Sequence, residues 1–449
     1  MSSITGITHR PRTLGQPAGQ PEGARWYYGL AIPMQVSSTK AALLVNIRDV
    51  GSRGADHVDF EQGSDAIVFD RVDAIDPARA VSLSRNHEEQ HPRARETCIM
   101  VKHPVISGFV PLGAKREDGS EHPHAGTGFG LSAAVAWPMR GTLLPGYQNH
   151  RPYGGEHEHG YTELFELRFD GETLHVDGVR RVADEAAWLG GYRLGFVGLT
   201  PPTPDGDDLL FPMRGCRANG EHMELGIARW RREGGAWRVS EWHEVADEEH
   251  EHFEMSVVRD RDGSLLYTAR GNTALVCHNF RVWRSTDNGR TWRDHLKVQW
   301  VRSAAPVTIN RAADGTPFLL ANLYETPLCG TADPLLTPRS PSGWVSIGGY
   351  RRDKLYAWAL SEDRENLEAP VLMRDCPADF GEPPGGSTWS ADHPMAQPLR
   401  LADERWHTVI TYRTLERGEN GLGCAPTEYT GCFVEEVQCA GEPVPLWRF

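Results

Sequence analysis

Short apolar runs alternate with polar turns along most of this chain, which is the pattern of an all-β protein. Two segments show a repeating unit best. Each begins with an Asp-Gly turn, continues into an apolar strand-like run and leads to a turn that contains tryptophan. These segments are Asp205–Gly215 and Asp262–Gly271, and weaker copies begin at Asp118, Asp314 and Ala402.

The spacing of the units predicts a β-propeller. The starts at 205, 262 and 314 are 57 and 52 residues apart, and a period of about 50 residues with four short strands is typical of a propeller blade. Five units are visible, and the strands around Trp26 to Ile47 supply a sixth. We therefore expect residues 26–449 to form one propeller domain with six blades, with seven as the alternative. Residues 1–25 are polar and rich in proline and glycine, which predicts an irregular segment.

A short box between two strand-like segments favours the same fold. Ser285, Asp287, Gly289, Thr291 and Trp292 spell Ser-x-Asp-x-Gly-x-Thr-Trp. The serine and aspartate side chains can satisfy nearby backbone donors, the glycine supplies a positive φ, and the tryptophan can anchor the turn. This box resembles the Asp-box of sialidase-like propellers, which indicates architecture and not chemistry.

The resemblance to sialidases extends to candidate binding residues. In that family a glutamate precedes an Asp-Gly turn and an arginine ends the following strand, and Glu254 and Arg270 match this order. Arg352 matches an arginine of the next blade, and Arg214 occupies the place of Arg270 one unit earlier. The resemblance implies that these arginines hold a sugar carboxylate through paired hydrogen bonds. The alternative is that they form salt bridges at blade edges.

Other positions depart from the family pattern. Where a sialidase has its tyrosine nucleophile, this chain has Asp392 and His393. Where the family has an early arginine and an acidic acid/base, His103 and His124 stand instead. Together with Glu254, the Asp392 and His393 pair forms a candidate group for acid, base or nucleophile roles.

A histidine-rich stretch between His87 and His159 suggests a second chemistry. A hairpin of two inner strands would place His103 beside His122 or His124 at the propeller axis. With a tyrosine such as Tyr161, this pairing resembles the active sites of propeller polysaccharide lyases, in which a neutral base takes a proton next to a uronate carboxylate. The alternative is a set of surface or hydrogen-bonded core histidines.

The sequence gives weaker signs of metal binding. His157-Glu-His159 places two imidazoles on one face of a strand, and Cys277-His278 offers a second pair, but neither completes a ligand set. The eight cysteines contain no Cys-x-x-Cys pair. No Walker loop, dinucleotide fingerprint or Gly-x-Ser-x-Gly elbow is present. We expect no metal and no cofactor.

The charge balance restricts the partners. With 47 basic and 61 acidic residues the net charge is -14, which disfavours nucleic acid and anionic membranes but allows a local arginine cluster to bind an acidic substrate. The N-terminal 25 residues contain no apolar run, so no signal peptide or membrane span is expected and the location is predicted to be cytoplasmic. Long loops at Pro145–Tyr161 and Glu325–Tyr350 are predicted to form rims over a central pocket.

Three functions remain open at this point. The first is an exo-acting glycoside hydrolase on an acidic sugar, which would use the arginines and the Glu254, Asp392 and His393 group. The second is a lyase on a uronate-containing glycan, which would use His103, His124 and Tyr161. The third is a non-catalytic propeller that binds glycans. The expected partner in each case is an acidic glycan, and the sequence predicts no oligomeric state.

Overall fold

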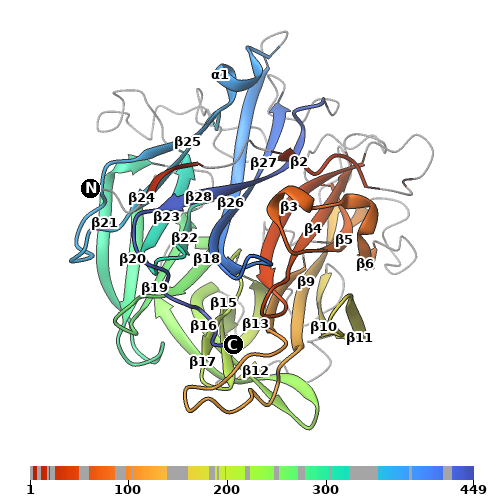
Figure 1. Ribbon diagram of the computed structural model, residues 1–449, viewed down its shortest axis with the longest axis vertical. Coiled ribbons are helices and arrows are strands. Elements are labelled where there is room, and N and C mark those ends of the chain that lie inside the picture. Colours follow the sequence, from red (N-terminus) through yellow and green to blue (C-terminus); the bar gives the residue numbers. More distant parts are fainter. Residues whose placement is uncertain are drawn as a thin grey trace.

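The computed structural model shows a nearly all-β molecule in which six four-stranded blades form a ring (Figure 1). The predicted six-bladed propeller is confirmed. The structure describes residues 4–7, 12–17, 20, 26–49, 60–85, 98–102, 105–138, 160–181, 188–189, 192–197, 199–217, 223–246, 252–271, 279–302, 306–322, 352–383, 387–417 and 427–449. Within these residues no helix has the length and apolar character that crossing a membrane requires.

The first three blades follow one another from the N-terminal part of the chain. Blade 1 is β3 (Trp26–Gln35), β4 (Ala41–Asp49), β5 (Phe60–Phe69) and β6 (Val81–Arg85). Blade 2 is β8 (Ile106–Val110), β9 (Thr127–Pro138), β10 (Gly160–Phe169) and β11 (Leu174–Arg181), with β7 (Cys98–Lys102) also paired to β9. Blade 3 is β13 (Tyr192–Val197), β15 (Asp208–Arg217), β16 (Met223–Glu233) and β17 (Ala236–Ala246), with β12 (Trp188–Leu189) and β14 (Thr203–Asp205) at its side.

The other three blades complete the ring. Blade 4 is β18 (His252–Arg259), β19 (Leu265–Gly271), β20 (Asn279–Ser285) and β21 (Arg293–Arg302). Blade 5 is β22 (Thr308–Arg311), β23 (Pro317–Asn322), β24 (Lys354–Ala359) and β25 (Val371–Asp375). Blade 6 is β26 (Thr388–Arg400), β27 (Trp406–Arg417), β28 (Gly431–Cys439) and β1 (Ile4–Ile7), with β2 (Arg12–Thr13) also on β28. The short helices are η1 (Val72–Ala74), η2 (Pro77–Arg79) and α1 (Cys376–Phe380).

The N-terminal segment takes part in closing the ring. Residues 1–25 are expected to be irregular, yet Ile4–Ile7 pairs antiparallel with β28 and forms the fourth strand of blade 6. The side chain of Ile4 is 1% exposed and lies in the core cluster of Phe433 and Val437. The sequence did not predict this strand, because β1 is only four residues long and its partner β28 comes from the other end of the chain.

The Asp-Gly turns used to find the repeat occupy equivalent places. Gly119, Gly206, Gly263 and Gly315 all have φ between 64° and 86°. Each lies in the hairpin between the first two strands of its blade or immediately before its second strand. Glycine adopts this left-handed conformation without the steric cost of a side chain, so the turn is encoded locally in each unit.

Hydrogen bonds join the inner strands of successive blades. The amide of Ile309 on β22 donates to Ser256 Oγ on β18 at 2.7 Å. The amide of Ala396 on β26 donates to Asn310 Oδ1 on β22 at 2.8 Å. The hydroxyl of Thr411 on β27, the second strand of blade 6, donates to the carbonyl of Ala31 on β3 of blade 1. These buried polar side chains hold successive blades against one another around the axis.

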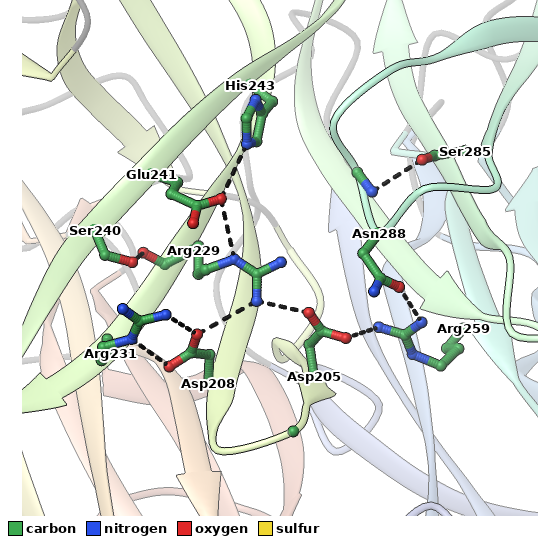
Figure 2. Close-up of polar contacts among 12 residues, drawn as sticks. Asp205, Asp208, Arg229, Arg231, Ser240, Glu241, His243, Arg259, Ser285 and Asn288 are labelled. Carbon is green, nitrogen blue, oxygen red and sulfur yellow. Dashed lines mark hydrogen bonds and ion pairs between the residues drawn. The ribbon is translucent and has the colours of Figure 1, made fainter.

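The outer hairpin that carries the Ser-x-Asp box joins β20 to β21. Asp287 accepts bonds from the amide and hydroxyl of Thr291 at 2.9 and 2.6 Å, and Ser285 Oγ accepts from the amide of Gly289 at 2.9 Å. Arg259 of blade 4 links this turn to blade 3, because its guanidinium donates to Asn288 at 3.0 Å and pairs with Asp205 of blade 3 at 2.9 Å (Figure 2). The box therefore has a structural role between blades 3 and 4.

Candidate functional site

Two polar side chains stand on β-bulges of inner strands. The pairing of β18 with β19 shifts register between Phe253 and Ser256, and the pairing of β26 with β27 shifts between Asp392 and Met395. In these bulges Glu254 and His393 have φ of 56° and 52°. Residues other than glycine rarely adopt positive φ, and such residues concentrate at functional sites. A bulge redirects a side chain that a regular strand would send elsewhere.

Neighbouring blades hold both bulges in place. The carbonyl of Met255, which follows Glu254, accepts a bond from the amide of Leu199 in blade 3 at 2.7 Å. The carbonyl of Pro394, which follows His393, accepts from Thr308 Oγ1 in blade 5 at 2.8 Å. Proline has no amide hydrogen, so a bulge is one of the few places where it fits inside a sheet. The two bulges are thus supported by contacts between blades.

The side chains of Glu254 and His393 lie next to each other. Nε2 of His393 lies 3.4 Å from Oε1 of Glu254, and Nδ1 lies 2.9 Å from Oδ1 of Asp392. The second oxygen of Glu254 accepts a bond from Arg270 Nη1 at 2.8 Å. The imidazole therefore lies between two carboxylates, so it can donate to both when it is protonated.

Asp392 lies behind this imidazole and is fully buried. Arg413 approaches it with both ends of its guanidinium fork, Nε to Oδ1 at 2.7 Å and Nη2 to Oδ2 at 2.9 Å. Oδ2 also accepts bonds from Arg352 Nη1 at 2.8 Å and Ser390 Oγ at 2.9 Å. Paired charge-assisted bonds of this kind compensate the cost of burying a carboxylate.

The backbone of Arg352 is tied to the strand that carries Asp392. Its carbonyl accepts bonds from the amide of Ala391 at 2.6 Å and from Asn322 Nδ2 at 3.2 Å. The same amide group of Asn322 donates to the carbonyl of Ala391 at 2.8 Å. Arg352 thereby reaches the group from blade 5, while Arg270 and Arg413 reach it from blades 4 and 6.

The charges around the two carboxylates keep them ionised. Burial raises the pKa of Glu254, but Arg270 and His393 outweigh it and lower the pKa to about 2. Burial likewise opposes ionisation of Asp392, and Arg413, His393 and Arg352 hold the pKa well below its usual range. Both groups are therefore anions at neutral pH.

The structure brings together five of the residues predicted as site residues: Glu254, Arg270, Arg352, Asp392 and His393. It adds Arg413 and Ser390, which the sequence reasoning missed. A signal for Arg413 was present, because Thr411-Tyr-Arg413 repeats the pattern of Thr268-Ala-Arg270. The register confirms the equivalence, since Arg270 pairs with Phe253 and Arg413 pairs with Asp392, the residues that directly precede the two bulges.

His124 does not join this group, contrary to the prediction that it lines the axis. It lies in the connection between β8 and β9, where its ring packs edge to face against Trp237 of blade 3 and against His122. The connection is longer than a tight hairpin, and His122 turns back toward Trp447. Burial lowers the pKa of His124, and the charges of His122 and Arg232 lower it further. The paired-histidine lyase interpretation is not supported.

Several other predictions fall on parts that the structure describes incompletely. Tyr161 is on β10 and Arg214 is on β15, opposite the register shift of β13, but their side chains are not described. Other predictions fall outside the described residues: His103, the His157-Glu-His159 and Cys277-His278 pairs, and the predicted rim at Glu325–Tyr350. Of the other predicted rim, residues 145–159 are also not described. Among the described residues no three metal-ligating side chains gather.

Comparison with known proteins identifies the fold. No family model and no curated protein matches this sequence. Among solved structures, a protein of unknown function from Dyadobacter fermentans covers 96% of this chain and 99% of its own length, at 12% identity and a TM-score of 0.54. The sialidase of Trypanosoma rangeli covers 95% of this chain at 12% identity and a TM-score of 0.55, and a Hadza microbial sialidase covers 92% at 14% identity and 0.53.

These matches show that the fold is a six-bladed β-propeller like that of sialidases. This chain spans 59% of the length of the Trypanosoma rangeli sialidase and 66% of the Hadza enzyme. At 12 to 14% identity the likeness shows a shared fold and not a shared activity.

Proposed function

We propose that this protein is an exo-acting glycoside hydrolase whose substrate is an acidic sugar. The observation that carries the proposal is the Glu254 and His393 pair, which two β-bulges aim at each other beside Arg270 and Arg352. The sialidase neighbours support it at the level of fold, and one of them is described in complex with sialic acid. Glycoside hydrolysis needs a group that transfers a proton and an anion that stabilises the positive transition state.

The arginines are proposed to bind the carboxylate of the sugar. The side chains of Arg270 and Arg352 are 14% and 13% exposed, so a ligand can reach both guanidiniums while Arg270 binds Glu254 and Arg352 binds Asp392. A guanidinium presents its N–H donors in a planar fork that matches the two oxygens of a carboxylate. Two guanidiniums from adjacent blades would then orient the sugar ring above the Glu254 and His393 pair.

Exposure separates the roles of the three acid and base candidates. The side chains of Glu254 and His393 are 10% and 13% exposed, whereas that of Asp392 is 0% exposed. Glu254 and His393 are therefore the groups proposed to touch substrate. Glu254, held as an anion, would stabilise positive charge at the anomeric carbon, and His393 would give or take a proton. Asp392 would orient the imidazole without contacting the sugar.

Hydrolysis of fluorogenic 4-methylumbelliferyl glycosides tests this proposal. Glycosides of sialic acid, of 2-keto-3-deoxynononic acid and of hexuronic acids should release the fluorophore, whereas matched neutral glycosides should not. Glu254→Gln and His393→Asn should each reduce kcat by about 10²–10⁴-fold, the usual contribution of a lost proton-transfer or charge-stabilising group. Arg270→Lys keeps the charge but loses the fork, so it should raise KM for acidic substrates.

His175→Asn provides the matched control, because His175 is a paired histidine on the exposed side of β11. Its activity should equal that of the wild type. Absence of turnover on every acidic glycoside by folded protein, or full activity of Glu254→Gln, would refute the hydrolase. Products that absorb in the ultraviolet through a new C4–C5 double bond would indicate a lyase instead.

A further inference from the structure

We propose that Arg413 is a positioning residue, which fixes His393 by clamping Asp392. The inference deepens the proposed function and rests on it for the role of His393. The side chain of Arg413 is 0% exposed, so a substrate in the site would not touch it. Its influence must therefore pass through the groups that it touches.

The two hydrogen bonds from Arg413, called the clamp below, fix the orientation of the Asp392 carboxylate, which a single bond would leave free to rotate. Arg413 binds one oxygen through Nε and the other through Nη2, at 2.7 and 2.9 Å, so the plane of the carboxylate follows the plane of the guanidinium. Ser390 Oγ adds a third bond to Oδ2 at 2.9 Å. With the carboxylate fixed, Oδ1, which accepts from Arg413 Nε, also lies 2.9 Å from Nδ1 of His393.

The clamp also selects which nitrogen of His393 carries the proton. Nδ1 faces Oδ1 of Asp392 at 2.9 Å and Nη2 of Arg413 at 3.3 Å. A guanidinium nitrogen cannot accept a proton, and the shorter contact is the one to the carboxylate. Nδ1–H therefore donates to Asp392, which leaves Nε2 as the nitrogen that exchanges a proton on the side of Glu254 and the substrate.

Arg270 is the equivalent of Arg413 in blade 4, but the two arginines differ in exposure and in the bonds that they make. Arg270 and Arg413 have the same register position relative to their bulges. Arg270 is partly exposed and binds Glu254 through one nitrogen, so a ligand can reach it. Arg413 is enclosed and uses two nitrogens on Asp392. The same position thus supplies a binding arginine in blade 4 and a positioning arginine in blade 6.

Nuclear magnetic resonance of histidine labelled with ¹⁵N tests the inference without a substrate. The His393 signals are assigned by their loss in His393→Gln. At a pH where the ring is neutral, wild-type His393 should show a single tautomer with the proton on Nδ1. Arg413→Lys cannot form the two parallel bonds, so His393 should become a mixture of the two tautomers. If activity is found, kcat of this variant should fall by about 10²-fold.

Two further variants make the result decisive. Arg229→Lys removes the fork of a buried arginine that pairs with Asp205 and Asp208 in blade 3, and it should leave the His393 signals unchanged (Figure 2). Ser390→Ala removes only one bond to Asp392 and should shift the His393 tautomer balance in the same direction as Arg413→Lys, by a smaller amount. Ser390→Ala therefore also tests the positioning role if Arg413→Lys does not fold.

Wild-type tautomer populations in both Arg413→Lys and Ser390→Ala would overturn the positioning role. If Arg229→Lys changes the His393 spectrum in the same way as Arg413→Lys, the positioning role would also be overturned, because the change would then reflect a general loss of stability. These outcomes are independent of the proposed function. A protein without hydrolase activity could still show the tautomer change, and an active one could lack it.

Discussion

The charge of Glu254 links the candidate site to the stability of the fold. The side chain is enclosed, and it remains an anion because Arg270 and His393 surround it. A buried carboxylate without such partners would shift its pKa upward and become neutral. The residues that form the candidate site therefore also make the burial of Glu254 energetically acceptable in the folded protein.

Acid should reduce the stability that Glu254 contributes. Its pKa is about 2 in the folded protein, against about 4.3 for an unfolded glutamate. Because the folded value is the lower one, ionisation stabilises the fold fully above the unfolded pKa, and this stabilisation disappears as the pH falls from about 4.3 toward 2. The full contribution is about 3 kcal/mol. The unfolding free energy of wild type relative to Glu254→Gln should therefore decrease by this amount on acidification.

Urea unfolding between pH 2 and 6 measures the effect. Glu172→Gln is the matched control, because Glu172 is an exposed glutamate paired with Lys40 at the surface, and its stability relative to wild type should change little with pH. A constant difference between wild type and Glu254→Gln over the whole range would show that Glu254 is not held ionised by its neighbours.

Single elements of this propeller differ in how far their own sequence encodes them. The Asp-Gly turns and the Ser-x-Asp box are local: the glycine conformations and the bonds of Asp287 lie within a few residues of chain. Such features can be predicted from the sequence. The bulges at Glu254 and His393 cannot be predicted in this way, because hydrogen bonds from other blades stabilise them, such as the bond from Leu199 to Met255.

The placement of the histidines shows the same limit. His393 was found through a family pattern, and its contact with Glu254 joins residues from blades 4 and 6. His124 was predicted at the axis on the assumption of a tight hairpin, but the connection from β8 to β9 carries it to Trp237. Connection lengths and contacts between blades are long-range properties that a periodic pattern does not specify.

The outer hairpin of blade 4 should be important for stability and dispensable for binding. Asp287→Ala removes the acceptor for the amide and hydroxyl of Thr291 and should lower the unfolding free energy by about 1–2 kcal/mol. Asp294→Ala is the control, since Asp294 is exposed on the following strand. Affinity for an acidic glycan should be the same in both variants. A selective loss of affinity in Asp287→Ala would place the hairpin near the site.

On the scale of the whole molecule, the ring is held by contacts that pass from each blade to the next. The inner strands of blades 4, 5 and 6 exchange side-chain hydrogen bonds, and Thr411 continues the series into blade 1. The candidate site uses the same blades, because Arg270, Arg352 and Arg413 come from three consecutive ones. Its geometry therefore depends on closure of the ring as well as on local structure.

The first strand takes part in closing the ring. β1 completes blade 6 by pairing with β28, and Ile4 buries its side chain in the core of that blade. Deletion of residues 1–9 should lower the unfolding free energy by about 3 kcal/mol, from loss of one buried isoleucine and of the strand hydrogen bonds. Thermal unfolding followed by circular dichroism measures this change.

The deletion should also leave β28 with an unpaired edge on the side that β1 covers. Unpaired edges favour pairing with another copy of the chain, so size-exclusion chromatography should show more oligomer in the deleted protein than in the full chain. Ile4→Ala separates the two effects: it removes the apolar contact but keeps the backbone pairing, so it should lower stability without promoting association. An unchanged unfolding midpoint together with an unchanged elution profile after the deletion would show that the ring closes without β1.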